Sequence, residues 1–211
     1  MKRNVFAVLV GTAALGAATV GAAQSTTPAT TGSYSSMNVG AAPIHGLDGP
    51  AFSVAASDAN GFQIAASRLS LMRSQRSDVK DYARRIISES QTAQQTLMAS
   101  LSNNQRKFAR PSTHLSAERA SMLKMLRSTP RRSFDNLYLT QSAQVQQGNW
   151  ATYKGYAEDG ADQSLKQVAG NGVPIIEQQL QQGGALLPSA LSANRVVRAA
   201  KESLAAQPSS N

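Results

Sequence analysis

Apolar residues return at helical spacing along four long stretches of the chain, and this pattern predicts four amphipathic helices. The first stretch follows the turn sequence Asp48-Gly49-Pro50, and its expected inner face consists of Phe52, Ala55, Ala59, Phe62, Ala66 and Leu69. The second stretch follows Ser77 and Asp78, which offer an N-cap, and ends near residues 102–104. Its expected inner face consists of Val79, Ala83, Ile86, Ser90, Ala93 and Leu97, so a hydroxyl lies in the interior at mid-length.

Turn residues mark where the third and fourth stretches begin and end, and apolar residues of the fourth, from Leu165 to Leu180, repeat with helical spacing. The third runs from Thr129 to Asp159, and glutamines interrupt its apolar stripe. Asp162 can cap the fourth, which contains Pro174, a residue expected to kink it. The apolar residues between positions 115 and 127 predict a short helix there, before the third stretch. The sequence therefore predicts an all-α fold, an antiparallel four-helix bundle with a short helix in the connection between helices 2 and 3.

The two ends of the chain differ in composition from this central domain, which we place at residues 51–187. Basic residues, an apolar run from Val5 to Val20 and small residues after it predict a secretory signal peptide over residues 1–23, with an uncleaved membrane anchor as the alternative. Residues 24–50, rich in Ser, Thr, Gly, Pro and Ala, predict a flexible linker. Residues 188–211 form a tail, in which Ala190 to Ala206 can make a short basic helix or fray. We expect a periplasmic or secreted protein with no transmembrane segment in its mature chain.

The chain is basic, with 21 Lys and Arg against 12 Asp and Glu and a formal net charge of +9. The basic residues are dispersed along the sequence, and no aromatic residues alternate with them to stack on bases, so no nucleic acid partner is expected. Solvated helix faces explain such charge. The alternative is binding to the anionic polysaccharides or lipid headgroups of a cell envelope. The absence of cysteine excludes disulfides and thiolate chemistry.

Side chains that carry metal or acid–base chemistry are few and scattered. The chain has no Glu-x-x-His sequence, the motif that di-iron carboxylate bundles use in pairs. Its histidines, His45 and His114, fall in the linker and in a loop, and we expect neither to have a second candidate ligand nearby. Gly-x-Ser-x-Gly and phosphate-loop sequences are also absent. Asp58, Glu89 and Glu177 could form an oxygen-only site if packing gathers them, but we expect neither catalysis nor a cofactor.

Four local sequences occur in order and at compatible spacings over about residues 51–187. They are residues 52–69, Ser77-Asp78-Val79-Lys80-Asp81-Tyr82-Ala83-Arg84-Arg85-Ile86-Ile87, Phe134-Asp135-Asn136-Leu137-Tyr138 and Val173-Pro174-Ile175-Ile176. Together they resemble an exported bacterial family of ferritin-like proteins, that of domain of unknown function 4142. The resemblance implies a ferritin-like four-helix bundle with a long connection between the second and third helices. It implies no particular activity, because the function of the family is not settled.

The resemblance also implies where relatives would place metal ligands, and this chain differs at each position. Relatives carry histidine at the positions of Ser90, Gln146 and Gln179, and glutamate at the position of Gln63. Neutral amides and a hydroxyl are poor ligands for a hard cation. We therefore expect these four side chains to face the core, to bind no metal and to hydrogen-bond one another or water.

Three functions remain open at this point. The first is an exported, metal-free structural or interaction module of the cell envelope. Its partner is unknown, and an envelope protein is one candidate. The second is a metal-dependent oxidase or stress-protective protein that uses a rearranged carboxylate site. The third is a cationic binder of envelope polyanions.

Overall fold

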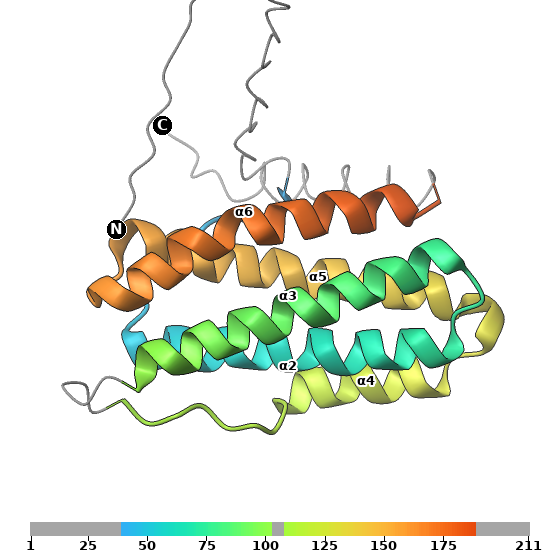
Figure 1. Ribbon diagram of the computed structural model, residues 1–211, viewed down its shortest axis with the longest axis horizontal. Coiled ribbons are helices and arrows are strands. Elements are labelled where there is room, and N and C mark those ends of the chain that lie inside the picture. Colours follow the sequence, from blue (N-terminus) through green and yellow to red (C-terminus); the bar gives the residue numbers. More distant parts are fainter. Residues whose placement is uncertain (1–38, 103–107, 189–211) are drawn as a thin grey trace, which may run out of the picture. The chain divides into compact units, whose positions relative to one another are not determined.

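The computed structural model describes residues 39–102 and 108–188, and across them the chain forms five helices and no strand (Figure 1). The helices are α2 (Gly49–Arg73), α3 (Ser77–Leu101), α4 (Ala117–Ser128), α5 (Arg131–Asp159) and α6 (Gln163–Leu186). The predicted all-α fold is therefore confirmed. The expected signal peptide and nearly all of the C-terminal tail lie outside the described residues. None of these five helices is both long enough and apolar enough to cross a bilayer.

The four long helices pack side by side, each against two others (Figure 1). α2 packs against α3 and α5, and α6 packs against the same two helices from the other side. The short helix α4 lies beside α2 and has a smaller contact with α5. Each long helix therefore contributes one face to a shared interior.

The interior contains two hydrophobic clusters. Phe52, Trp150 and Tyr156 belong to the first, in which the rings of Phe52 and Tyr156 stack with centroids 4.3 Å apart. The second is built around Phe62, Ile86 and Tyr138. Along α3, Ser90 lies between Ile86 of the second cluster and Leu97 of the first. Along α5, Gln146 lies between Val145 of the second cluster and Trp150 of the first. Polar side chains thus occupy the junction between the clusters on these helices.

The inner face of α2 differs from the expected one. Ala55 is exposed and Leu69 is half-buried, whereas Ala56 is fully buried. A second buried row on this helix is polar and consists of Ser53, Ser57, Asn60, Gln63, Ser67 and Ser70. α2 buries two neighbouring rows because α3, α4 and α5 all pack against it. Apolar periodicity alone could not reveal a buried row made of small polar residues.

Two of the expected helix starts are present, and one is different. Asp48 Oδ1 accepts a hydrogen bond from the Ala51 N–H at 2.7 Å, and Asp162 Oδ1 accepts one from the Leu165 N–H at 2.9 Å. At α3 the N-cap is Arg76, which has no capping side-chain bond; the cap expected at Ser77 or Asp78 is wrong. Arg76 Nη2 instead donates to Asp78 Oδ2 at 2.7 Å.

Residues 39–48 form a strap that packs against α5. Val39 is buried, and its carbonyl accepts a hydrogen bond from Gln147 Nε2 at 2.7 Å. The Ile44 N–H donates to the Ala151 carbonyl at 2.9 Å. The flexible linker expected over residues 24–50 is therefore wrong for this strap. Composition could not show that α5 offers hydrogen-bond partners for its backbone.

Arg73, the last residue of α2, fastens α4 and α5 to this helix. Its Nη1 donates to the Leu126 carbonyl at 3.1 Å and its Nη2 to the Thr129 carbonyl at 2.6 Å. The guanidinium carbon also lies 5.0 Å from the centroid of the Phe134 ring. Because the carbonyls at the end of a helix have no partner within it, one arginine satisfies the end of α4 and joins three helices.

Candidate functional site

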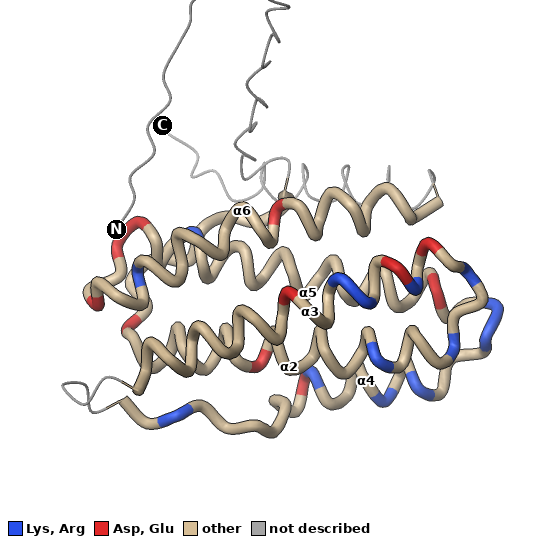
Figure 2. Tube along the Cα trace, in the orientation of Figure 1, with Lys and Arg blue, Asp and Glu red and all other residues tan. Residues whose placement is uncertain are grey.

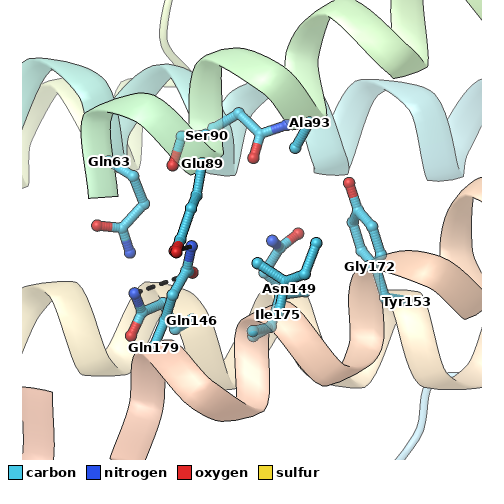
Figure 3. A pocket seen from close by; sticks show the side chains of 12 residues that line it. Gln63, Glu89, Ser90, Ala93, Gln146, Asn149, Tyr153, Gly172, Ile175 and Gln179 are labelled. Carbon is cyan, nitrogen blue, oxygen red and sulfur yellow. Dashed lines mark hydrogen bonds between the residues drawn. The ribbon is translucent and has the colours of Figure 1, made fainter. Parts of the chain in front are cut away.

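A small cavity lies where α2, α3, α5 and α6 meet (Figure 3). Its volume is about 30 Å³, which is enough for about two water molecules. The four positions singled out in the sequence are buried and line this cavity, one from each long helix: Gln63, Ser90, Gln146 and Gln179. Folding thus brings these four side chains to one place.

A chain of hydrogen bonds runs along this cavity from α5 to α6 and on to α3 (Figure 3). Gln146 Nε2 donates to Gln179 Oε1 at 3.2 Å. Gln179 Nε2 in turn donates to Glu89 Oε2 at 2.8 Å. An amide suits the middle of such a chain because it donates and accepts at the same time. Gln179 therefore connects a neutral amide to a carboxylate.

Tyr82 joins this chain from α3. Gln146 Nε2 donates to the Tyr82 hydroxyl at 3.2 Å, and that hydroxyl donates to the main-chain oxygen of Gln179 at 3.3 Å. Gly183 of α6 leaves room for the phenol, because a Cβ there would lie 2.6 Å from the hydroxyl oxygen. A larger residue at position 183 would therefore force the Tyr82 phenol to move.

Gln63 forms a separate pair with Ser142. Gln63 Nε2 donates to the Ser142 carbonyl at 2.9 Å, and the Ser142 hydroxyl donates to Gln63 Oε1 at 2.8 Å. These two bonds join α2 to α5 inside the core. The buried side chain of Ser90 lines the same cavity from α3. All four long helices therefore supply polar groups to the centre, in two hydrogen-bonded sets and one hydroxyl.

The three carboxylates considered for an oxygen-only metal site have different partners. Glu89 accepts from Gln179, whereas Glu177 Oε1 accepts from the Trp150 indole N–H at 3.0 Å. Asp58 accepts from both the N–H and the hydroxyl of Ser116, each at 2.8 Å, at the start of α4. Within residues 39–102 and 108–188, no three His, Asp or Glu side chains are grouped so that they could hold a metal ion. The packing does not bring Asp58, Glu89 and Glu177 together.

His45 has two carboxylate neighbours, and the expectation that it would have none is wrong. Its Nδ1 lies 3.2 Å from Asp159 Oδ2, and its Nε2 lies 3.7 Å from Glu158 Oε2. The Gly46 N–H donates to Asp159 at 2.9 Å, and this bond lowers the pKa of the Asp159 carboxyl. His45 lowers that pKa as well, by a smaller effect. These side chains are exposed, so the ion pairs contribute little energy. They do attach the strap to the end of α5.

A wider groove of about 200 Å³ runs between α3 and α6 and shares Glu89, Tyr153 and Gly172 with the cavity. Burial raises the pKa of Tyr153 to about 12, so its phenol stays protonated at physiological pH. Gly172 packs against this ring, where a Cβ would lie 2.4 Å from Tyr153 Cε1. Among the described residues, the polar groups that line the cavity and the groove are hydroxyls, amides and the single carboxylate of Glu89, and the rest of the lining is apolar.

Comparison with known proteins places the chain in a family. Residues 36–186 match the family described as a domain of unknown function, DUF4142. The chain belongs to the DUF4142 family. No curated protein and no solved structure matches it. The DUF4142 match includes the strap as well as all five helices, in agreement with the packing of the strap on α5.

Two contributors to this DUF4142 site were not singled out from the sequence. Tyr82 stands about one helical turn from Val79 and Ile86, so helical spacing could have placed it on the inner face. Ser142 carries no such signal, because serine is common on protein surfaces. Its role depends on the partner across the interface, which a single sequence does not show.

Proposed function

We propose that this DUF4142 protein is an exported module of the cell envelope, structural or interacting in role, with no metal and no catalytic group at its centre. The hydrogen-bond chain from Gln146 through Gln179 to Glu89 carries the proposal. Metals in helical bundles are held by several carboxylates and imidazoles. The polar side chains at this centre are five amides, one serine hydroxyl, the phenols of Tyr82 and Tyr153 and the one carboxylate of Glu89, and they do not fit that requirement.

We propose further that the arrangement is a ferritin-like antiparallel bundle of four helices. Only residues 74–76 connect α2 to α3, and only residues 160–162 connect α5 to α6. Connections this short join neighbouring helices that run in opposite directions. The longer connection, which contains α4, joins α3 to α5.

Elemental analysis tests the metal-free centre. The protein is purified without added metal and measured before and after dialysis against a chelator. Iron, manganese and zinc are expected well below one equivalent per chain. A stoichiometric metal that survives chelation would overturn the proposal, because neutral amides cannot retain a hard cation against such a competitor.

Cell fractionation with mass spectrometry tests export. The protein is expected in the periplasm or the medium, with an N-terminus close to residue 24. A cytoplasmic protein that retains residues 1–23 would contradict this part of the proposal and leave the metal result unaffected.

The rival function is a metal-dependent oxidase or stress-protective protein with a rearranged carboxylate site. One observation favours it, since Glu89 lines both the cavity and the groove. In that case Glu89→Ala abolishes metal uptake, while Glu118→Ala, at an exposed acid on α4, leaves uptake unchanged. No uptake by the parent protein rules this function out.

A further inference from the structure

Basic residues gather at one end of the helices, where α2 joins α3 and α4 joins α5 (Figure 2). Residues 68–85 contain six Lys and Arg against two Asp, and residues 117–132 contain five against one Glu. The chain as a whole has a net charge of +9, so these two segments hold most of its excess. The basic residues of these two segments are far apart in the sequence, but the fold gathers them at one end of the helices.

Some of these cations have partners within the protein. Arg73 bonds to carbonyls at the end of α4, Arg76 pairs with Asp78, and Arg84 pairs with Asp81. A second group is exposed, and none of the ion pairs within the described residues involves it. The cations of this second group are Arg68, Arg85, Lys124, Arg127, Arg131 and Arg132. These six residues and the exposed Met72 and Met125 together are called the basic end.

Two of these arginines occupy a position that is unfavourable for the local helix. Arg131 and Arg132 form the start of α5, which has neither an acidic residue in its first turn nor a capping side-chain bond. Positive charge at the N-terminus of a helix opposes the helix dipole. Helix stability therefore does not explain these cations, whereas binding of an anion beside them does.

The two exposed methionines distinguish between anionic partners. Met72, 71% exposed, precedes Arg73, and Met125, 56% exposed, lies in the last turn of α4. A polysaccharide or free phosphate offers charge but no apolar layer for these side chains. A bilayer surface offers both, since cations meet its phosphates while apolar side chains enter the boundary between headgroups and acyl chains.

We infer that the basic end docks on the surface of an anionic phospholipid bilayer. The arginines bind phosphate oxygens through paired N–H groups, and the methionines contact the headgroup layer. Acidic residues at the far end of α5 and at the start of α6, Glu158, Asp159 and Asp162, orient the molecule with its basic end toward the membrane. The inference names a partner for the interaction module proposed above, and it is independent of metal at the centre.

Sedimentation with vesicles tests the inference. The processed protein is mixed with phosphatidylcholine vesicles, with and without phosphatidylglycerol, at increasing sodium chloride. Binding is expected only with the anionic lipid and is expected to weaken as salt rises. The triple variant Arg127→Gln, Arg131→Gln and Arg132→Gln is expected to lose on the order of one hundredfold in partition coefficient.

A second triple variant is the matched control, because it removes three cations from other parts of the fold. Its substitutions are Arg110→Gln, Lys154→Gln and Lys166→Gln, and its binding is expected to change less than about threefold. Equal losses in both variants overturn the inference, because net charge alone would then explain binding. No binding by the parent overturns it, and so does stronger binding to dextran sulfate than to the vesicles.

Fluorescence tests the orientation on α2. Trp150, the one native tryptophan, is buried and gives a constant signal. Met72→Trp is expected to shift its emission to shorter wavelength when anionic vesicles are added. Val54→Trp, at a position 57% exposed and about 27 Å away along the same helix, is expected to show no shift. A shift at residue 54 without one at residue 72 would place the membrane at the wrong end.

Discussion

Gly155 of α5 lies directly under Ile44 of the strap: a Cβ on residue 155 would stand 1.9 Å from the Ile44 main-chain oxygen. The same strap residue donates its N–H to Ala151, one helical turn earlier on α5. Backbone therefore packs on backbone at this point, and only glycine permits the approach. The strap and this part of α5 fit each other although more than a hundred residues separate them in the sequence.

Gly155→Ala is expected to destabilise the protein by displacing the strap. Overpacking of this kind costs about 1–3 kcal/mol, and the obstacle here is main chain that cannot rotate away. Urea denaturation followed by circular dichroism measures the change. Gly148→Ala is the control, because nothing lies within 4 Å of a Cβ on residue 148 of the same helix. Alanine there is expected to raise the free energy of unfolding by up to about 1 kcal/mol. Equal effects of the two substitutions would show that the strap is not held against Gly155.

Gln179→Met tests the hydrogen-bond chain at the centre. The substitution keeps the length of the side chain but removes the donor to Glu89 and the acceptor for Gln146. Leaving both groups without this partner is expected to cost about 1–3 kcal/mol in the free energy of unfolding. Gln178→Met, one residue earlier on the exposed face of α6, is expected to change it by less than about 0.5 kcal/mol. A Gln179→Met protein as stable as its control would mean that these bonds add nothing to the fold.

The attachment of the strap is expected to depend on pH through Asp159. Its carboxyl has a lowered pKa because the Gly46 N–H and His45 favour the ionised form. A carboxyl with a lower pKa in the folded than in the unfolded chain stabilises the folded state fully above its ordinary pKa of about 3.9. That contribution is lost as the pH falls through the folded value, so the Gly46 amide resonance is expected to titrate below about pH 4. Asp159→Asn is expected to abolish the titration, whereas Asp81→Asn, an exposed acid of α3, leaves it intact. A Gly46 amide that still titrates in Asp159→Asn would assign the effect to another group.

Local features of the fold could be predicted from the sequence, and features that depend on a distant partner could not. The inner face of α3 is buried at Val79, Ile86 and Leu97 because strong apolar periodicity decides the orientation of that helix. The cap at Asp162 could also be predicted, because its hydrogen-bond donor is the N–H of Leu165, only three residues along the chain. Ala55 does not lie on the buried face because most side chains of α2 are small and its apolar residues are not confined to one side. The packing of the neighbouring helices therefore sets the rotation of α2.

For the candidate site, too, some features could be predicted from the sequence and others could not. Gln63, Ser90, Gln146 and Gln179 could be located on the inner faces because a family resemblance supplied their positions. Their pairing could not, since Gln63 bonds to Ser142 while Gln146 and Gln179 bond to each other. The basic end is the extreme case, because residues 68–85 and 117–132 are distant in sequence and only the packing of α2, α4 and α5 gathers their basic residues at one end of the helices (Figure 2).

The geometry of the centre predicts that two substitutions would create a metal site. Gln146 Nε2 and Gln179 Oε1 lie 3.2 Å apart, and Glu89 is in contact with Gln179. Two nitrogen ligands of a tetrahedral zinc ion, each about 2.0–2.1 Å from it, lie about 3.3 Å from each other. The double variant Gln146→His and Gln179→His is therefore expected to bind one Zn²⁺ with Glu89 as the third protein ligand. Competition with a chromogenic chelator measures the affinity.

Comparison variants separate this site from adventitious binding. The pair Gln146→His and Gln178→His has the same composition but directs one imidazole to solvent, and it is expected to bind at least tenfold more weakly. Adding Glu89→Ala to the first pair is expected to weaken zinc binding by a similar factor, because the site then loses its only anionic ligand. If both double variants bind zinc equally, the side chains at positions 146 and 179 do not converge. If the parent protein binds as tightly as either, its amides are not what keeps the centre free of metal, and the proposed function fails with that result.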